Sequence, residues 1–200
     1  MAYSIEAALK SRLFEEVMVS TDDEEIAEVA KIYGASVPFM RSVETSSDYA
    51  TTNDVIREVI DTYKKFGKEF EVICCLYSTA PFVTPERLRE AFNELRKQEC
   101  ESVFTAVAYS YPVQRSIVIG EKGYAEMKWP EFRYSRSQDL PKFYHDAGQF
   151  YFYTLDYFLK GHGLAEGEAK MLELSELEVQ DLDTPTDWKL AELKYTLLHT

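Results

Sequence analysis

The chain has 200 residues, 46% of them hydrophobic, so it is long enough for one sizeable core and too short for two comfortable domains. Thirty-five acidic against 22 basic residues give a formal net charge of -13, which disfavours non-specific binding to nucleic acid or to an anionic membrane. No apolar run approaches the roughly 20 residues of a membrane-spanning helix, and no signal peptide opens the chain. We expect one cytoplasmic domain, residues 1–200, that binds neither nucleic acid nor membrane.

The first part of the chain alternates between helical and extended periodicity. The first helix is predicted by four apolar residues on one face: Ile5, Ala8, Leu9 and Leu13. Residues 16–20 follow as a short buried strand. Thr21, with Glu24 three residues later, caps a second helix that ends at Gly34. The apolar stripe of this helix is predicted to be Ile26, Val29, Ala30 and Tyr33. Residues 37–40 are extended again, so helices and strands alternate from the start.

The strand predicted at residues 71–77 is apolar at nearly every position. This pattern is typical of a central strand that is covered on both faces in a parallel sheet. A helix that ends near Gly67 precedes it, and Thr84 and Pro85 begin the next helix, after which residues 102–107 return as a strand. The alternation predicts a three-layer α/β fold with right-handed crossovers.

The alternation is interrupted between residues 109 and 142. Residues 117–119 resemble a short strand, residues 120–123 a turn, and an aromatic-rich stretch surrounds Trp129. These features predict a β-hairpin insertion. The strand pattern resumes at residues 149–153, so the insertion lies within the one domain.

Asp181 and Asp183 are the strongest metal-binding candidates. On an extended segment, residues two apart project to the same side, so both carboxylates can bind one ion. Mg²⁺ is usually held by one or two carboxylates, water and substrate phosphates, so the pair predicts a Mg²⁺ site that a nucleoside triphosphate completes. The alternative is structural, with Asp181 solvated and Asp183 capping the helix that Thr184 and Pro185 begin. The predicted apolar face of that last helix is Trp188, Ala191, Tyr195 and Leu198.

Polar side chains between residues 135 and 151 form a second candidate site. Arg136 can bind a carboxylate through two hydrogen bonds, and Gln138 and Gln149 offer amide groups to hydroxyls. Such groups suit an acidic sugar. Taken singly, each of these residues is more often a solvated loop residue than a ligand-binding one.

Two further clusters are candidate binding loops. Residues 76–82 follow the carboxyl end of the strand predicted as central, where open α/β sheets bind ligands, although an ordinary turn ended by Pro81 is the alternative. Residues 41–54 end in Thr51, Thr52, Asn53 and Asp54, whose side chains can either cap the following helix or contact a nucleoside.

In this order, the motifs resemble the cytidylyltransferases that activate nonulosonic acids, and most closely the pseudaminic acid cytidylyltransferases, over essentially the whole chain. The matching segments are Tyr3-Ser4-Ile5-Glu6-Ala7-Ala8, Val19-Ser20-Thr21-Asp22-Asp23, Tyr77-Ser78-Thr79-Ala80-Pro81-Phe82, Pro112-Val113-Gln114-Arg115, Arg136-Ser137-Gln138-Asp139, His145-Asp146-Ala147-Gly148-Gln149-Phe150-Tyr151 and Gln180-Asp181-Leu182-Asp183-Thr184. The resemblance implies a Rossmann-like fold of the nucleotide-diphospho-sugar transferase type. It also implies transfer of CMP from CTP to a nine-carbon acidic sugar, with release of pyrophosphate.

The resemblance implies roles for individual residues. Asp181 and Asp183 would carry Mg²⁺ and, with Arg136, serve catalysis. Substrate contacts are implied for Thr52, Tyr77, Ser78, Thr79, Ala80, Gln138, Tyr144 and Gln149. The insertion, residues 109–142, implies a homodimer.

Two departures from the family pattern bear on function. Sialic acid relatives have a glutamine at the position of Tyr77 and a proline-asparagine pair at His145 and Asp146, so the sugar pocket here differs and pseudaminic acid is favoured. Sialic, legionaminic or 3-deoxy-octulosonic acid is the alternative acceptor. Relatives also begin with a strand and a Gly/Arg/Lys-rich nucleotide loop that the start of this chain does not match, and that strand would be central in the sheet. A non-catalytic remnant that binds a sugar or a partner is therefore the alternative to an enzyme.

Overall fold

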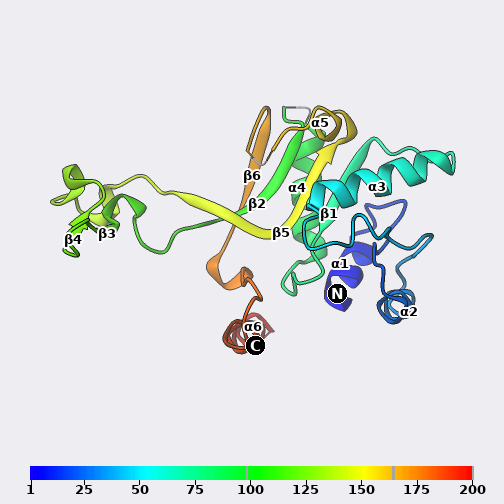
Figure 1. Ribbon diagram of the computed structural model, residues 1–200, viewed down its shortest axis with the longest axis horizontal. Helices are drawn as coiled ribbons and strands as arrows, with labels where there is room; N and C mark the ends of the chain where they lie inside the picture. Colours follow the sequence, from blue (N-terminus) through cyan, green and yellow to red (C-terminus); the bar gives the residue numbers. More distant parts are fainter. Residues whose placement is uncertain (98, 164, 200) are drawn as a thin grey trace.

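The computed structural model describes residues 1–97, 99–163 and 165–199, which form helices around one main sheet and a projecting insertion (Figure 1). The main sheet has the order β1-β5-β2-β6, with β1 at Val72–Leu76, β2 at Ser102–Ala108, β5 at Tyr144–Thr154 and β6 at Ala169–Leu174. β2 pairs with β6 in parallel, whereas β5 runs antiparallel to β1 and β2. The α/β prediction is confirmed, but the sheet is mixed rather than parallel.

β2 and β5 form the two sides of a long hairpin, and the insertion is its loop. Ala108 at the end of β2 pairs with Tyr144 at the start of β5. Because the chain leaves the sheet after β2 and returns at the same end of the strands, β5 must run antiparallel to β2. The predicted hairpin is present within the insertion as β3 (Ile117–Ile119) and β4 (Ala125–Met127), which pair only with each other and lie away from the main sheet (Figure 1). Short 3-10 helices occupy Val113–Arg115, Pro130–Phe132, Ser137–Asp139 and Glu176–Glu178.

Helices cover both faces of the main sheet, which confirms the three layers. α1 (Ala2–Ser11) and α4 (Pro85–Arg96) pack on one face, and α3 (Thr52–Lys65) and α5 (Leu155–Leu159) on the other. α4 begins as predicted, because the Thr84 hydroxyl accepts a hydrogen bond from the Arg87 N–H at 3.2 Å. α5 and β6 were not predicted.

Successive residues of β5 enter opposite layers. Phe150 and Phe152, fully buried, lie in the core under α1 and α4, whereas Tyr151 and Tyr153 lie in the core under α3 and α5. This alternation follows from the two-residue period of a strand. It places two tyrosines together on the α3 side.

The first third of the chain differs most from prediction. Residues 16–20 and 37–40 are not strands: Met18 makes a single parallel bridge, to Ser36, and residues 37–40 have no strand pairing. β1 is an edge strand, not a central one: it pairs with β5 on one side and with no strand of the described residues on the other. Its five residues are accordingly half-buried.

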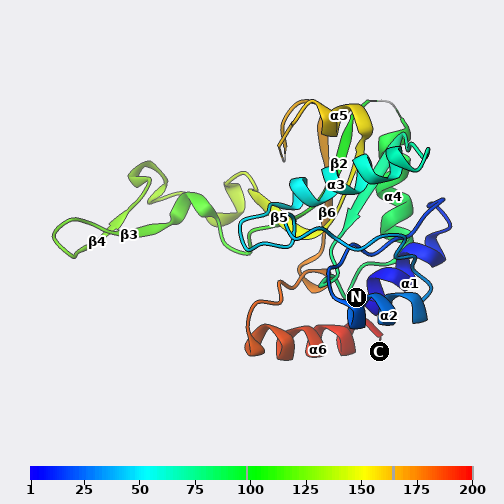
Figure 2. The ribbon, with the colours of Figure 1, turned by 45° about the vertical axis from the view of Figure 1, so that its right-hand side comes forward.

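Two helices present different faces from those predicted. In α2 (Glu24–Ile32), Asp23 rather than Thr21 is the N-cap, and its carboxylate accepts from the Ile26 N–H at 2.9 Å. The predicted stripe is largely exposed, and the helix packs through its small residues Ala27 and Ala30. In α6 (Pro185–His199), Ala191 is buried while Trp188 is 60% exposed, and Tyr195 packs on Tyr3 of α1 with ring centroids 5.4 Å apart. Figure 2 shows the C-terminal end of α6 beside α1. Within the described residues, no helix is both long and apolar enough to cross a membrane.

Candidate active site

A cavity of about 360 Å³ lies against the α3 face of the sheet. It is bounded by the start of α3, by β1, β5 and α5, and its lining includes Thr52, Cys75, Tyr77, Asp146, Tyr151 and Tyr153. No lysine or arginine of the described residues lines it. The cavity is therefore mainly aromatic, with the Asp146 carboxylate and the His162 imidazole among its lining.

The N-terminus of α3 contributes Thr52 to the cavity. Thr51 caps the helix, since its hydroxyl accepts from the Asp54 N–H at 3.2 Å and its own N–H donates to the Asp54 carboxylate at 2.8 Å. These hydrogen bonds lower the pKa of Asp54. Because Thr51 is the cap, the Thr52 hydroxyl is left to face the cavity, 3.5 Å from the Tyr77 hydroxyl.

Asp146 is held in a fixed position in the cavity wall. One carboxylate oxygen accepts from the Tyr151 hydroxyl at 2.6 Å, and the other accepts from the Gly148 N–H at 3.0 Å. Gly148 has a φ of 61°, a left-handed conformation that favours glycine. The Tyr151 ring also lies 5.5 Å from that of Tyr77, and burial, with the Asp146 carboxylate, raises the pKa of Tyr151. Tyr151 therefore stays protonated and donates to Asp146.

The turn after β1 lies beside the cavity and is fixed by its backbone. The Tyr77 N–H donates to the Gln149 carbonyl at 2.9 Å, and the Ser4 hydroxyl donates to the Tyr77 carbonyl at 2.9 Å. Ala80 is buried, whereas Ser78 and Thr79 are exposed. Of these four candidates, Tyr77 lines the cavity.

Gln149 connects this turn to the segment that carries the two aspartates. Its side chain is buried, and its amide nitrogen donates to the carbonyl oxygen of Glu178. β1 and β6 run in the same direction, so their carboxyl ends, the Tyr77 turn and the segment after β6 lie at the same end of the sheet. Open α/β sheets bind ligands at the carboxyl ends of their strands.

An ion pair also fixes the segment after β6. The Arg87 guanidinium donates to both carboxylate oxygens of Glu178, at 2.8 and 3.0 Å, and the Ser175 N–H and hydroxyl donate to one of them. The Arg87 contact is the main reason that the pKa of Glu178 falls from 4.5 to about 2. Glu178 lies three residues before Asp181, so the Arg87–Glu178 ion pair fixes the position of the chain just before the two aspartates.

Asp181 and Asp183 are both exposed, and Leu182 between them is half-buried. The Asp181 carboxylate accepts from the Leu182 N–H at 3.1 Å, and the chain bends at Asp183. The Asp183 side chain is not the cap of α6, because the Thr184 hydroxyl accepts from the Asp187 N–H at 3.3 Å. No cluster of three or more acidic, histidine or cysteine side chains suited to a metal occurs among the described residues. Two oxygen ligands therefore fit Mg²⁺ only with substrate phosphates and water completing its shell.

Replacement of Arg87 by Met is expected to lower the free energy of unfolding at pH 7 by about 1–3 kcal/mol, because the Glu178 carboxylate loses its charged donor. The lowered pKa of Glu178 contributes stability above pH 4.5 that is lost as the pH falls toward 2. The variant should therefore lose less stability than the native chain over this range. Urea unfolding at pH 7 and pH 3 measures both effects.

The matched control is Lys10→Met, which breaks an exposed ion pair with Glu6. It should change stability by less than about 0.5 kcal/mol, with no effect on the pH dependence. Equal losses in the two variants would contradict the positioning role of Arg87.

The other candidates lie outside the cavity lining. Arg136 makes two hydrogen bonds to the Asp139 carboxylate, at 2.6 and 3.1 Å, and Gln138 is exposed beside it in the insertion. Tyr144 donates to the Glu173 carboxylate at 3.0 Å, which raises the pKa of Tyr144. The structure does not bring these three residues to Tyr77 or to the cavity.

Sequence reasoning did not select Asp146, Tyr151 and Tyr153 as site residues. The available signal was the alternation of tyrosines at positions 151 and 153, which places both on one face of the strand. Which face holds a cavity depends on α3 and α5, so the strand pattern could not decide it.

A model of the family described as Cytidylyltransferase matches residues 1–178. The chain belongs to this family. It is 37% identical over 199 residues to the pseudaminic acid cytidylyltransferase of Campylobacter jejuni subsp. jejuni serotype O:2, which covers 100% of this chain and 86% of that relative. It is 35% identical over 202 residues to the CMP-N,N'-diacetyllegionaminic acid synthase of Legionella pneumophila, covering 96% of this chain and 83% of that one. The predicted family is confirmed.

Solved structures support the cytidylyltransferase fold. The CMP:2-keto-3-deoxy-manno-octonic acid synthetase, in complex with CTP, has a TM-score of 0.64 at 18% identity over 98% of this chain and 86% of that one. The 4-diphosphocytidyl-2C-methyl-D-erythritol synthase of Anaerococcus prevotii has a TM-score of 0.59 at 13% identity over 98% and 85%. Both likenesses concern the fold alone, and they confirm the Rossmann-like nucleotidyltransferase architecture.

Proposed function

We propose that this chain transfers CMP from CTP to a nonulosonic acid, with pseudaminic acid as the preferred acceptor, and releases pyrophosphate. The observation that carries the proposal is that the cavity beside Tyr77 and the segment bearing Asp181 and Asp183 lie at the same end of the sheet. Gln149 connects them, because it accepts from the Tyr77 N–H and donates to the Glu178 carbonyl. An acceptor in the cavity and phosphates at the aspartates would then be neighbours. The 37% identity to a pseudaminic acid cytidylyltransferase favours this acceptor.

The cavity suits an uncharged, apolar part of the acceptor. Its walls carry tyrosine rings, on which the C–H faces of a sugar can pack, and the Asp146 carboxylate, which accepts hydrogen bonds. The acceptor's own carboxylate would be repelled by Asp146, and no lysine or arginine of the described lining would offset this. We therefore propose that the carboxylate end points outward, past Thr52 and Tyr77.

Asp181 and Asp183 are the residues that would hold Mg²⁺, which when bound neutralises charge on the CTP phosphates. Gln149 and the Arg87–Glu178 ion pair hold the segment that carries Asp181 and Asp183 at the carboxyl end of β6. Tyr77 and Thr52 would orient the acceptor so that its anomeric oxygen faces the α-phosphorus. The chain thus contributes mainly by positioning. We propose that the reaction takes place in the cytoplasm, where CTP is made.

A CTP-dependent pyrophosphate-release assay with Mg²⁺ tests the function. Pseudaminic, sialic, legionaminic and 3-deoxy-octulosonic acids are compared as acceptors. We expect the highest kcat/KM with pseudaminic acid and loss of activity with EDTA. Equal inactivity with all four acids would refute the enzymatic proposal for this chain and favour a binding role.

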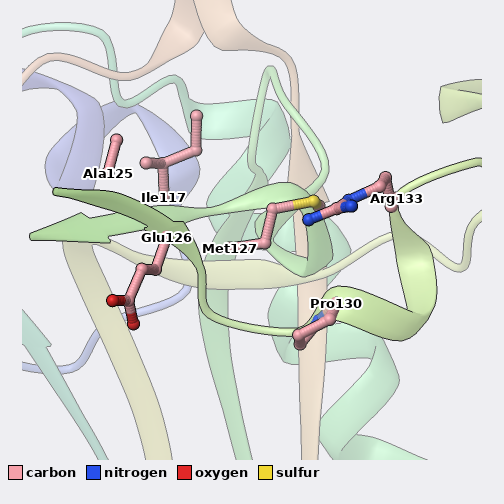
Figure 3. Close-up of a pocket in the computed structure, with 6 residues that line it drawn as sticks. All are labelled: Ile117, Ala125, Glu126, Met127, Pro130 and Arg133. Atoms are coloured by element: carbon pink, nitrogen blue, oxygen red, sulfur yellow. The ribbon is translucent and has the colours of Figure 1, made fainter. Parts of the chain in front are cut away.

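We further propose that the insertion forms a homodimer interface. It presents apolar side chains to solvent, with Ile117, Ile119 and Tyr124 at 69%, 83% and 72% exposure. A hollow of about 370 Å³ adjoins them, and Figure 3 shows Met127, Pro130 and Arg133 along it. Burial of such a patch against a second copy would remove apolar surface from water.

Replacement of Ile119 by Asp is expected to convert the dimer to a monomer, because two copies would bring buried carboxylates together. Light scattering at micromolar concentration measures the mass. Val43→Asp, which alters another apolar side chain at 86% exposure but outside the insertion, should leave the dimer intact. A native chain that is monomeric throughout would refute the proposed interface.

A further inference from the structure

The insertion, residues 109–142, joins the rest of the molecule through a neck formed by its two ends. These ends continue β2 and β5, and the hairpin of β3 and β4 projects away from the main sheet (Figure 1). Two side-chain contacts also connect the neck to the described body of the molecule. The Ser110 hydroxyl donates to the Glu176 carboxylate at 3.0 Å, and the Lys142 ammonium lies 3.7 Å from the Glu173 carboxylate.

Both contacts end on the stretch of chain that leads to the metal-binding candidates. Glu173 is the penultimate residue of β6, and Glu176 begins the short 3-10 helix that precedes Asp181. The Tyr144 hydroxyl, at the start of β5, donates to the Glu173 carboxylate as well, at 3.0 Å. Lys194 of α6 donates to the Glu176 carbonyl at 3.0 Å. The stretch is therefore joined to the insertion and to the body at once.

The two sides of the neck are tied to each other. Gln114 is buried, and its amide nitrogen donates to the Pro141 carbonyl at 2.9 Å. The Tyr109 N–H donates to the Phe143 carbonyl at 3.0 Å. Because the two sides are joined, a displacement of the insertion reaches both contacts with the stretch before the aspartates together.

Resting on the proposed CMP transfer and homodimer, we propose that the insertion regulates the metal site. Docking of a second copy on the insertion and binding of Mg²⁺ with CTP at Asp181 and Asp183 strengthen each other through Glu173 and Glu176. These two glutamates are positioning residues, since they act through the segment that carries the aspartates. A docked insertion has less freedom to move, so the stretch from Glu173 to Glu176 is ordered before the ligand binds.

The size and symmetry of this coupling follow from its physical origin. Hydrogen bonds and ion pairs at exposed positions are individually weak, so the contacts together give a modest effect of about 10-fold. Coupling between two binding events is reciprocal. Mg²⁺ with CTP therefore lowers the dissociation constant of the dimer by the same factor by which the dimer binds Mg²⁺ and CTP more tightly than the monomer does.

Light scattering over a dilution series, with and without Mg²⁺ and CTP, measures the dissociation constant of the dimer. No acceptor is added, so no turnover occurs. Mg²⁺ with CTP should lower the constant about 10-fold in the native chain and less than about twofold in the double variant Ser110→Ala, Lys142→Met, which lacks both contacts. Ser110 and Lys142 are exposed, so the Tm of the variant should not fall.

Arg115→Met is the matched control. It removes the same charge as Lys142→Met, but the Arg115 guanidinium contacts the Ser137 hydroxyl within the insertion, at 3.4 Å. The control should keep the effect of Mg²⁺ and CTP on the dimer. Equal tightening in the double variant, lost tightening in Arg115→Met, no effect on the native dimer, or a native chain that stays monomeric would overturn the inference.

Pyrophosphate release by the native chain, with an acceptor added, separates this inference from the proposed function. Tightening of the dimer by Mg²⁺ and CTP without turnover supports the coupling and overturns the CMP-transfer proposal. Turnover with no effect of Mg²⁺ and CTP on the dimer does the reverse.

Discussion

Replacement of Asp181 or Asp183 by Asn is expected to lower kcat/KM for CMP transfer by about 100-fold to 10,000-fold, since charge stabilisation by a bound metal is worth several kcal/mol. Each substitution removes one of the two exposed carboxylates of the segment after β6. The Mg²⁺ concentration for half-maximal activity should rise as well. Initial rates of pyrophosphate release across a Mg²⁺ titration measure both changes.

Glu192→Gln is the control for these variants. It removes the same charge from the neighbouring helix α6, and the new amide oxygen can still accept from the Trp188 indole, as Glu192 does at 3.2 Å. Its activity should remain within about twofold of the native chain, as usual for an exposed site away from the chemistry. If Asp183→Asn were as active as Glu192→Gln, Asp183 would not be a metal ligand.

Replacement of Phe150 by Ala is expected to lower the free energy of unfolding by about 3–5 kcal/mol, through lost burial and the cavity left behind. Phe150 is 0% exposed, and its ring packs edge-on against Phe152, 5.9 Å away. Domains of this size have about 5–15 kcal/mol in total. The loss would thus take much of the stability of the strand that carries Gln149 and Tyr151. Urea unfolding followed by circular dichroism measures it.

Phe143→Ala provides the comparison, because Phe143 is 49% exposed and precedes the same strand. The cost there should be below about 1 kcal/mol. Similar losses at the two positions would mean that β5 is not the centre of the core.

Helix α4 shows which features of the fold could be predicted. Thr84 and Pro85 are local signals that begin the helix as expected, and Leu88, Ala91 and Leu95 on its inner face are buried. The small helix α2 shows the opposite case, because its large apolar residues face solvent while Ala27 and Ala30 pack. Small side chains allow close approach, and hydrophobic periodicity does not reveal that requirement.

The strand β1 separates two properties that its sequence cannot distinguish. Val72, Cys74 and Leu76 pack into one core and Ile73 and Cys75 into the other, so both faces are covered as predicted. Its place at the edge depends instead on which strands pair with it. An apolar strand sequence indicates that both faces of the strand are covered, but it does not indicate how many strands pair with it, which depends on the whole sheet.

The amino-acid sequence by itself determined the family, the paired spacing of Asp181 and Asp183, and the turn at Tyr77, because these depend on residues close together in the chain. Only the tertiary structure decided that Gln149 bonds to Glu178, 29 positions away, and that Arg87 fixes the same segment from 91 positions away. It also brought Tyr151 and Tyr153 of β5 together with Thr52 of α3 around one cavity. Such contacts follow from how α3, β5 and the segment after β6 pack together, and no local pattern encodes that packing.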